Sequence, residues 1–224
     1  MATSGSSSFT LAIDEVIDEA FEAVGGEPVL GKEAATARRS LNLLLIDWQN
    51  RGINLWTLEA VVTAVATSVG SYTLTSSTAN ILDAYIRRDD LDLPLERISV
   101  YDYAGIPNKT QTGRPSKLFL DRQRGAPVAY LWPLPENSTD ELYFWRVRDF
   151  EDITRSADQH ADVPKRFLPA LTAGLAYYIS RKRKGVSPDR IARLKAEYEE
   201  LLMRAMEADD DGADMTIVPG GRRF

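Results

Sequence analysis

The hydrophobic periodicity of this chain changes twice along its 224 residues, and that change constrains the fold more than any other feature. Near both ends, apolar residues recur every three or four positions, the spacing of an amphipathic helix. In the middle, short runs rich in Val, Thr and aromatic residues are separated by turn residues, as strands are. The order helix, strand, helix predicts an α+β fold in which the strands are inserted between helical segments.

Four long helices are predicted from the helical segments. The first covers residues 10–24 and ends at Gly25, because glycine accepts the left-handed conformation of a helix stop. The second covers residues 32–50. A third follows Val163-Pro164, and Ser187 caps the fourth. The most economical packing of four such helices is a four-helix bundle.

The middle of the chain predicts several short strands and one short helix. Glycine- and proline-containing turns between the strands favour an antiparallel sheet or a small barrel. The predicted strands are residues 57–69, 72–74, 81–87, 117–121, 128–132 and 142–148, and the short helix is residues 99–106. The predicted domains are a flexible N-terminal arm (1–9), a helical bundle (10–53 and 163–208), an inserted antiparallel β domain (54–162) and an extended C-terminal arm (209–224).

The composition excludes several kinds of site. The chain has no cysteine, so disulfides, thiolate metal sites and a cysteine nucleophile are impossible, and this suits a protein made in a reducing cytoplasm. His160 is the single histidine, in an expected exposed loop, so we predict neither a metal site nor a cofactor. No apolar run reaches the length of a membrane span.

The net charge of −6 argues against a protein that grips nucleic acid, which usually carries a basic excess. A mildly acidic wall would instead repel phosphates and let DNA pass without specific binding. The 33 acidic residues leave open a hydrolase that uses two carboxylates, although the acids of residues 10–24 lie on a polar helix face where solvation is the usual reason for them.

Two clusters are candidates for a subunit or tail interface. Residues 142–148 carry large apolar side chains at alternate positions on both faces, with Tyr143, Trp145 and Val147 on the second face. A sheet that is apolar on both faces must be covered on both, and a neighbouring subunit could cover the second. The second cluster, Arg181, Lys182 and Arg183, lies near the end of a helix, where cations complement the helix dipole or contact phosphates.

The last ten residues form the third candidate. A run of apolar, β-prone residues follows an acidic, glycine-containing hinge, and a folded monomer has no obvious use for it. Such a run can be a frayed end, or a strand that adds to the surface of a partner. Its members are Met215, Thr216, Ile217, Val218, Pro219, Arg222, Arg223 and Phe224.

Several segments together resemble the head-to-tail adaptors of short-tailed phages, the tail tubular protein A or portal-tail accessory protein family. The matching segments, in order, are residues 43–56, Gly70-Ser71-Tyr72-Thr73-Leu74, residues 103–106 with Lys109 and Gly113-Arg114-Pro115, Leu131-Trp132-Pro133-Leu134-Pro135, residues 162–167, residues 170–176, and Ile217-Val218-Pro219-Gly220. The resemblance covers about residues 10 to 220.

The resemblance implies a structural protein of the virion without enzymatic activity. In this family the subunits form a ring, usually of twelve, between the portal protein and the tail nozzle or next tail component, and the ring extends the DNA channel. For residues 215–224 the resemblance implies a portal-binding arm. A neck connector of a long-tailed phage and a virion-associated peptidoglycan hydrolase remain as alternative functions.

Overall fold

The computed structural model describes residues 9–26, 32–53, 55–154 and 159–208, which form two compact units. The first unit takes the described residues up to Leu44 and from Ile153 onward. The second unit takes the described residues from Leu45 to Asp152. The boundary between Leu44 and Leu45 falls inside a helix, so the last residues of that helix belong to the second unit.

Helix α4 (Leu168–Ser180) is the centre of the first unit and packs against α1 (Ile13–Val24) and α5 (Pro188–Glu207). It is buried around most of its circumference, because its residues are nearly all apolar or small. Gly174 allows the closest approach: a Cβ atom there would lie 2.8 Å from Leu44 Cδ2 and 2.9 Å from Tyr198 Cε2. Helix α2 (Lys32–Asn50) and the 3₁₀ turn η2 (Lys165–Phe167) complete the helices that flank the strands in sequence.

The helix ends follow the local sequence signals. Gly25 and Gly52 take φ values of +85° and +80°, the left-handed region that a side chain disfavours. Gly25 ends α1 as predicted, and Gly52 follows the end of α2. Ser187 accepts a hydrogen bond from the backbone N–H of Arg190 at 3.3 Å, which confirms it as the cap of α5.

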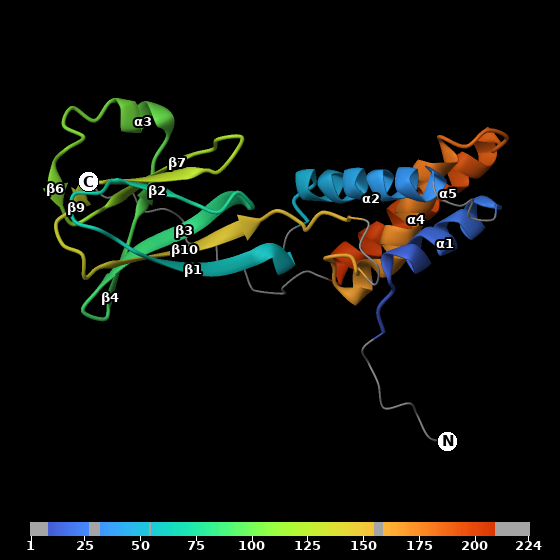
Figure 1. Cartoon of the computed structure of the whole chain (residues 1–224), viewed down its shortest axis with the longest axis horizontal. Helices are drawn as coiled ribbons and strands as arrows, with labels where there is room; N and C mark the ends of the chain where they lie inside the picture. The colour runs from blue at the N-terminus through green and yellow to red at the C-terminus, as the bar shows by residue number, and fades with distance from the viewer. Residues whose placement is uncertain (1–8, 27–31, 54, 155–158, 209–224) are drawn as a thin grey trace, which may run out of the picture. The chain divides into compact units, whose positions relative to one another are not determined.

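The second unit contains two four-stranded sheets and one two-stranded pair (Figure 1). The first sheet has the order β1 (Leu58–Ala64), β10 (Glu141–Arg148), β3 (Thr78–Arg88), β4 (Leu91–Pro94). The second has the order β2 (Ser71–Thr73), β8 (Val128–Trp132), β7 (Lys117–Asp121), β5 (Glu96–Arg97). The pair is β6 (Thr112–Gly113) with β9 (Leu134–Pro135); the short turn η1 (Leu55–Thr57) precedes β1, and α3 (Val100–Ala104) follows β5.

One apolar cluster joins the two sheets. Alternate residues of β3 and β10 in the first sheet and of β7 and β8 in the second are buried in it. The central members are Ile81, Ile86, Leu118, Leu131, Leu142 and Phe144. Each sheet therefore buries one face in a shared core. On the opposite face of the second sheet, Tyr103 of α3 packs against Phe119 and Tyr130.

The predicted four-helix bundle is wrong. The described residues form five α-helices, two 3₁₀ turns and ten strands, and the strands account for much of the fold. Helical periodicity shows which stripe of a helix is buried but not what covers it, and α2 is divided between the two units. The predicted β domain is also not purely antiparallel, since β5 pairs with β7 and β6 with β9 in parallel. These strands could not be predicted, because a strand of two residues is too short to show an alternation of apolar and polar side chains.

Candidate interaction surface

The first sheet has an open side that we call the outer face, formed by Ala60, Val62, Asp83, Tyr85, Tyr143 and Trp145. These residues alternate with the buried ones along β1, β10 and β3. Cross-strand pairing places Val62 beside Tyr143 and Tyr143 beside Tyr85. It also places Trp145 between Ala60 and Asp83. Val62 and Trp145 are 50% and 47% exposed, so the middle of this face shows apolar surface to solvent.

Aromatic stacking makes part of the outer face rigid. The rings of Tyr85 and Tyr143 stack with their centroids 5.1 Å apart and their planes at 7°. The Arg87 guanidinium lies 4.3 Å from the Tyr143 ring centroid and is held by Asp92 through two hydrogen bonds of 2.6 and 2.8 Å. The aromatic rings and the cation are thus held in place before any partner arrives, which lowers the entropy cost of binding.

Hydrogen bonds around the stack shift the pKa values of two groups. The Tyr143 hydroxyl donates to Glu141 Oε2 at 2.9 Å, and this bond is the main reason that the pKa of Tyr143 is raised. The hydrogen bonds from Arg87 lower the pKa of Asp92. Both shifts stabilise the protonation states found at neutral pH, so the edge of the outer face keeps its charge pattern near pH 7.

A register shift between β3 and β10 marks one end of the outer face. The pairing passes from Trp145–Asp83 to Arg146–Ile81, so Leu82 is skipped and is exposed together with Asp83. Val147, which the sequence places on the same side as Trp145, is only 8% exposed. The predicted second apolar face is therefore exposed at Trp145, partly exposed at Tyr143 and covered at Val147.

The two edges of the first sheet differ in how they resist pairing with another strand. Strand β4 is short and carries Asp92 and Pro94, a charge and a residue without an N–H group. Strand β1 has seven residues and one charge, Glu59, which is engaged by Arg146 and Arg148. The β1 edge is therefore the less protected of the two and continues the apolar part of the outer face at Val62.

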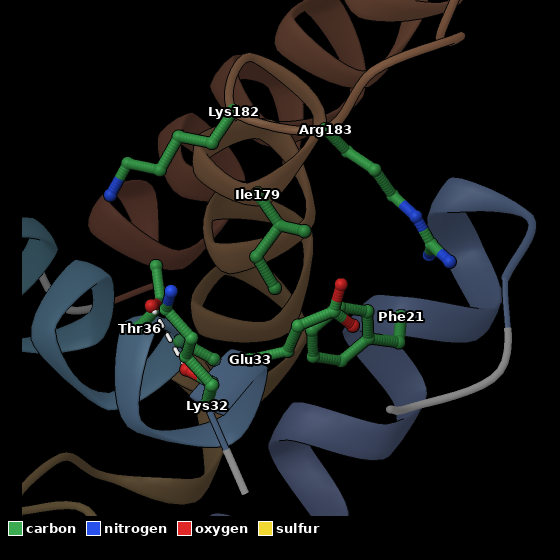
Figure 2. A pocket seen from close by; sticks show the side chains of 8 residues that line it. Phe21, Lys32, Glu33, Thr36, Ile179, Lys182 and Arg183 are labelled. Carbon is green, nitrogen blue, oxygen red and sulfur yellow. Dashed lines mark hydrogen bonds between the residues drawn. The ribbon is translucent and has the colours of Figure 1, made fainter. Parts of the chain in front are cut away.

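Arg181, Lys182 and Arg183 belong to the first unit, and Tyr143 and Trp145 belong to the second. Lys182 Nζ donates to Ser40 Oγ on α2 at 2.6 Å, and the Arg183 guanidinium lies 5.7 Å from the Phe21 ring on α1. Figure 2 shows these two side chains leaving the end of α4 in opposite directions. Both therefore connect helices within the unit, whereas Arg181 is exposed beside Tyr177.

A pocket of about 270 Å³ lies below Lys182 and Arg183 (Figure 2). Phe21, Ala37 and Ile179 provide its apolar lining, and Lys32 and Glu33 add charges. Glu33 Oε2 and Arg183 Nη1 are buried there without a hydrogen-bond partner among the described residues.

His160 contacts the residues that precede α1 and is not part of a metal site formed by the described residues. Its backbone bridges Ala12, and its Nδ1 atom lies 3.1 Å from the carbonyl oxygen of Leu11. Within the described ranges, no group of His, Asp and Glu is arranged to hold a metal ion. Among the described helices, none combines the length and the apolar character needed to cross a bilayer. The predicted arm, residues 215–224, lies outside the described residues.

The sequence points to Tyr143 and Trp145 as candidates, and it gives no sign that Val62, Tyr85 and Arg87 are their neighbours on the outer face. The sequence signal for Tyr85 was its place in a strand, yet nothing in the sequence gives the register that sets it against Tyr143. Val62 lies in a run of valines, threonines and alanines that indicates a strand without showing which side is open.

Comparison with known proteins identifies the family of the chain. A search of curated proteins finds none that matches. The family model of the SU10 adaptor protein matches residues 11–223, nearly the whole chain, and this agrees with the phage head-to-tail adaptor that the sequence resembles. The chain belongs to the SU10 adaptor protein family.

Proposed function

We propose that this protein is a head-to-tail adaptor subunit, which forms a ring between the portal and the tail of a phage virion and extends the DNA channel. Membership of a phage adaptor family supports a structural role in the virion. The observation that carries the proposal is the outer face, where Val62 and Trp145 are about half exposed beside a stacked tyrosine pair. A folded single chain gains nothing from leaving this surface in water, whereas an assembled ring would bury it.

The outer face is the proposed contact with a neighbouring subunit or with the tail nozzle. Tyr143 and Trp145 supply the aromatic surface that is enriched at the centre of protein interfaces. Arg181, which is exposed at the end of α4, is a second proposed contact with a neighbouring subunit or with the tail nozzle. Lys182 and Arg183 would act indirectly, by holding α2 and α1 against α4.

The proposed contact with the portal is the arm of residues 215–224. Its Met-Thr-Ile-Val run suits strand addition, and Arg222 and Arg223 suit an acidic surface. In a ring of twelve copies, each arm need contribute only a modest affinity, because the ring multiplies it. Without portal rings, the protein is expected to be monomeric or weakly associated.

DNA would pass through this ring without being bound specifically. The net charge of −6 disfavours a grip on phosphates. The protein would be made in the host cytoplasm, would enter the virion at the junction of head and tail, and would have no catalytic role.

Removal of residues 215–224 tests the proposal. The truncated protein should keep the circular dichroism spectrum and unfolding temperature of the full chain but should no longer sediment with portal rings of the same phage. Ile217→Asp with Val218→Asp should have the same effect. Asp209→Asn with Asp210→Asn, which lies before the portal-binding residues 215–224, is the matched control and should bind normally. Undiminished binding of the truncated protein would contradict the role of the arm.

A further inference from the structure

Two arginines of the second unit share a single acceptor atom. Arg97 Nη2 and Arg122 Nη2 donate to Asn80 Oδ1 at 2.8 and 3.1 Å, and Arg97 Nη1 donates to the carbonyl oxygen of Ile81 at 2.6 Å. Neither arginine forms an ion pair with an acid among the described residues. Burial and the nearby charge of Arg122 both lower the pKa of Arg97. The pair is therefore two neighbouring positive charges without an ion pair among the described residues, and an anionic partner would relieve their repulsion.

The surroundings of this pair suit a protein segment. An open cleft of about 670 Å³ is lined by Arg97 and Arg122 together with the apolar residues Ile98, Phe119 and Leu120. Guanidinium groups bind carboxylates through paired hydrogen bonds, and arginine with exposed apolar surface is typical of protein interfaces. A protein segment can contact the apolar part of this lining as well as the two guanidinium groups, whereas a DNA phosphate can use only the guanidinium groups.

The first unit carries the complementary charge. Helix α1 contains five acids and no basic residue. Two of them are engaged, since Asp14 pairs with Arg38 and Glu15 accepts a hydrogen bond from the backbone N–H of Ala12. The other three, Asp18, Glu19 and Glu22, are exposed, and none forms an ion pair with any residue of the described chain. They follow one another at spacings that place them on the side of α1 opposite its buried stripe.

A closed ring needs two different surfaces on each subunit, because every copy meets the next one head to tail. We propose that the exposed acids Asp18, Glu19 and Glu22 of one copy bind Arg97 and Arg122 of the next copy in the ring. This inference rests on the proposed ring and names its polar contact. A single exposed ion pair contributes little, but matched charges repeated around a ring fix the orientation of the subunits and oppose wrong contacts.

Charge exchange between two variants tests the pairing. Variant A carries Arg97→Glu and Arg122→Glu; variant B carries Asp18→Arg and Glu22→Arg. Each alone places like charges at every contact and should yield at least about tenfold fewer complete rings on portal, the effect of losing about 1.4 kcal/mol. In an equal mixture, copies that alternate restore opposite charges at every contact, so complete rings should return. Lys195→Glu with Arg204→Glu on α5 makes the same charge change as variant A and should assemble normally.

Because Arg97 also bonds to Ile81, the single variant Arg122→Glu is a second test. Arg122 is exposed, and among the described residues its side chain bonds to the Asn80 side chain alone, so this variant should fold and still assemble less well. Normal rings of a folded Arg122→Glu variant, or no rescue in the mixture, would overturn the inference. Salt-dependent DNA binding that Arg122→Glu removes, with assembly unchanged, would instead assign the pair to phosphate and overturn it as well.

Cross-linking separates this inference from the proposed function. The chain has no cysteine, so Glu22→Cys with Arg122→Cys introduces the only thiols. Oxidation on portal rings should give a ladder of covalent multimers, whereas each single cysteine variant should give at most dimers. If unmodified protein assembles on portal but the ladder is missing or the link forms within one chain, the inference fails and the ring stands. If unmodified protein forms no complex with portal, the proposed function fails.

Discussion

Arg88 donates two hydrogen bonds of 2.7 Å to the carboxylate of Asp140, whose side chain has no exposed surface. The pair joins the end of β3 to the residue that precedes β10. Arg88 also holds Glu136 at 2.7 Å, and the Asn137 side chain accepts a hydrogen bond from the Asp140 N–H at 3.1 Å. This network fixes the loop at one end of the first sheet.

Asp140→Asn should destabilise the protein by about 3 kcal/mol near pH 7, because it removes one charge of a buried ion pair and leaves Arg88 partly uncompensated. Urea unfolding followed by tryptophan fluorescence measures the change. Asp92→Asn, which breaks the exposed pair with Arg87, is the matched control and should change stability little. Equal losses in the two variants would show that burial does not strengthen the Asp140 pair.

The contribution of Asp140 should also depend on pH. Its hydrogen bonds with Arg88 are the main reason that its pKa is lowered in the folded protein. A carboxylate with a lowered folded pKa adds stability above its unfolded pKa, and that stability is lost as the pH falls through the folded pKa. The difference in unfolding free energy between the unmodified protein and Asp140→Asn should therefore shrink from about pH 6 to about pH 2. A constant difference over this range would contradict the prediction.

Gly174→Leu should destabilise the first unit by about 1–3 kcal/mol, the usual cost of overpacking. A Cβ atom at Gly174 already lies within 3 Å of Leu44 and Tyr198, and the Tyr198 ring has no room to withdraw because it is 2% exposed. Thermal unfolding measures the loss. Gly125→Leu, where nothing lies within 4 Å of an added Cβ, is the control and should be tolerated.

Much of the local structure could be predicted from the sequence, because local signals determine it. Residues 117–121 and 128–132 are strands as predicted, and 32–50 is a helix. Gly25 and Ser187 act at the helix ends that their chemistry favours. The run of residues 57–69 is a strand only to Ala64, since β propensity does not show where pairing with β10 stops.

The arrangement of these elements could not be predicted, because it depends on contacts between residues far apart in the chain. The stack of Tyr85 on Tyr143 requires the register of β3 against β10, including the skipped Leu82. Arg97 lies at the end of β5 and Arg122 directly follows β7, so their shared acceptor requires Asn80 of β3 to lie within reach of both strand ends. Helical stripes likewise suggested a four-helix bundle, although α2 is divided between two units.

Trp145→Ser combined with Val62→Ser should leave the fold intact and weaken assembly, because both side chains are about half exposed on the outer face and cover little of the core. If this face is the centre of an interface, the double variant should lose at least about 2 kcal/mol of binding free energy per contact, as expected for interface hot spots. Sedimentation with portal rings and with the next tail component separates the two possible partners. Met203→Ser, which is equally exposed on α5, is the control and should assemble normally. Unchanged binding to both partners would contradict the outer face as the assembly surface, because tryptophan at the centre of an interface is among the residues whose truncation costs most.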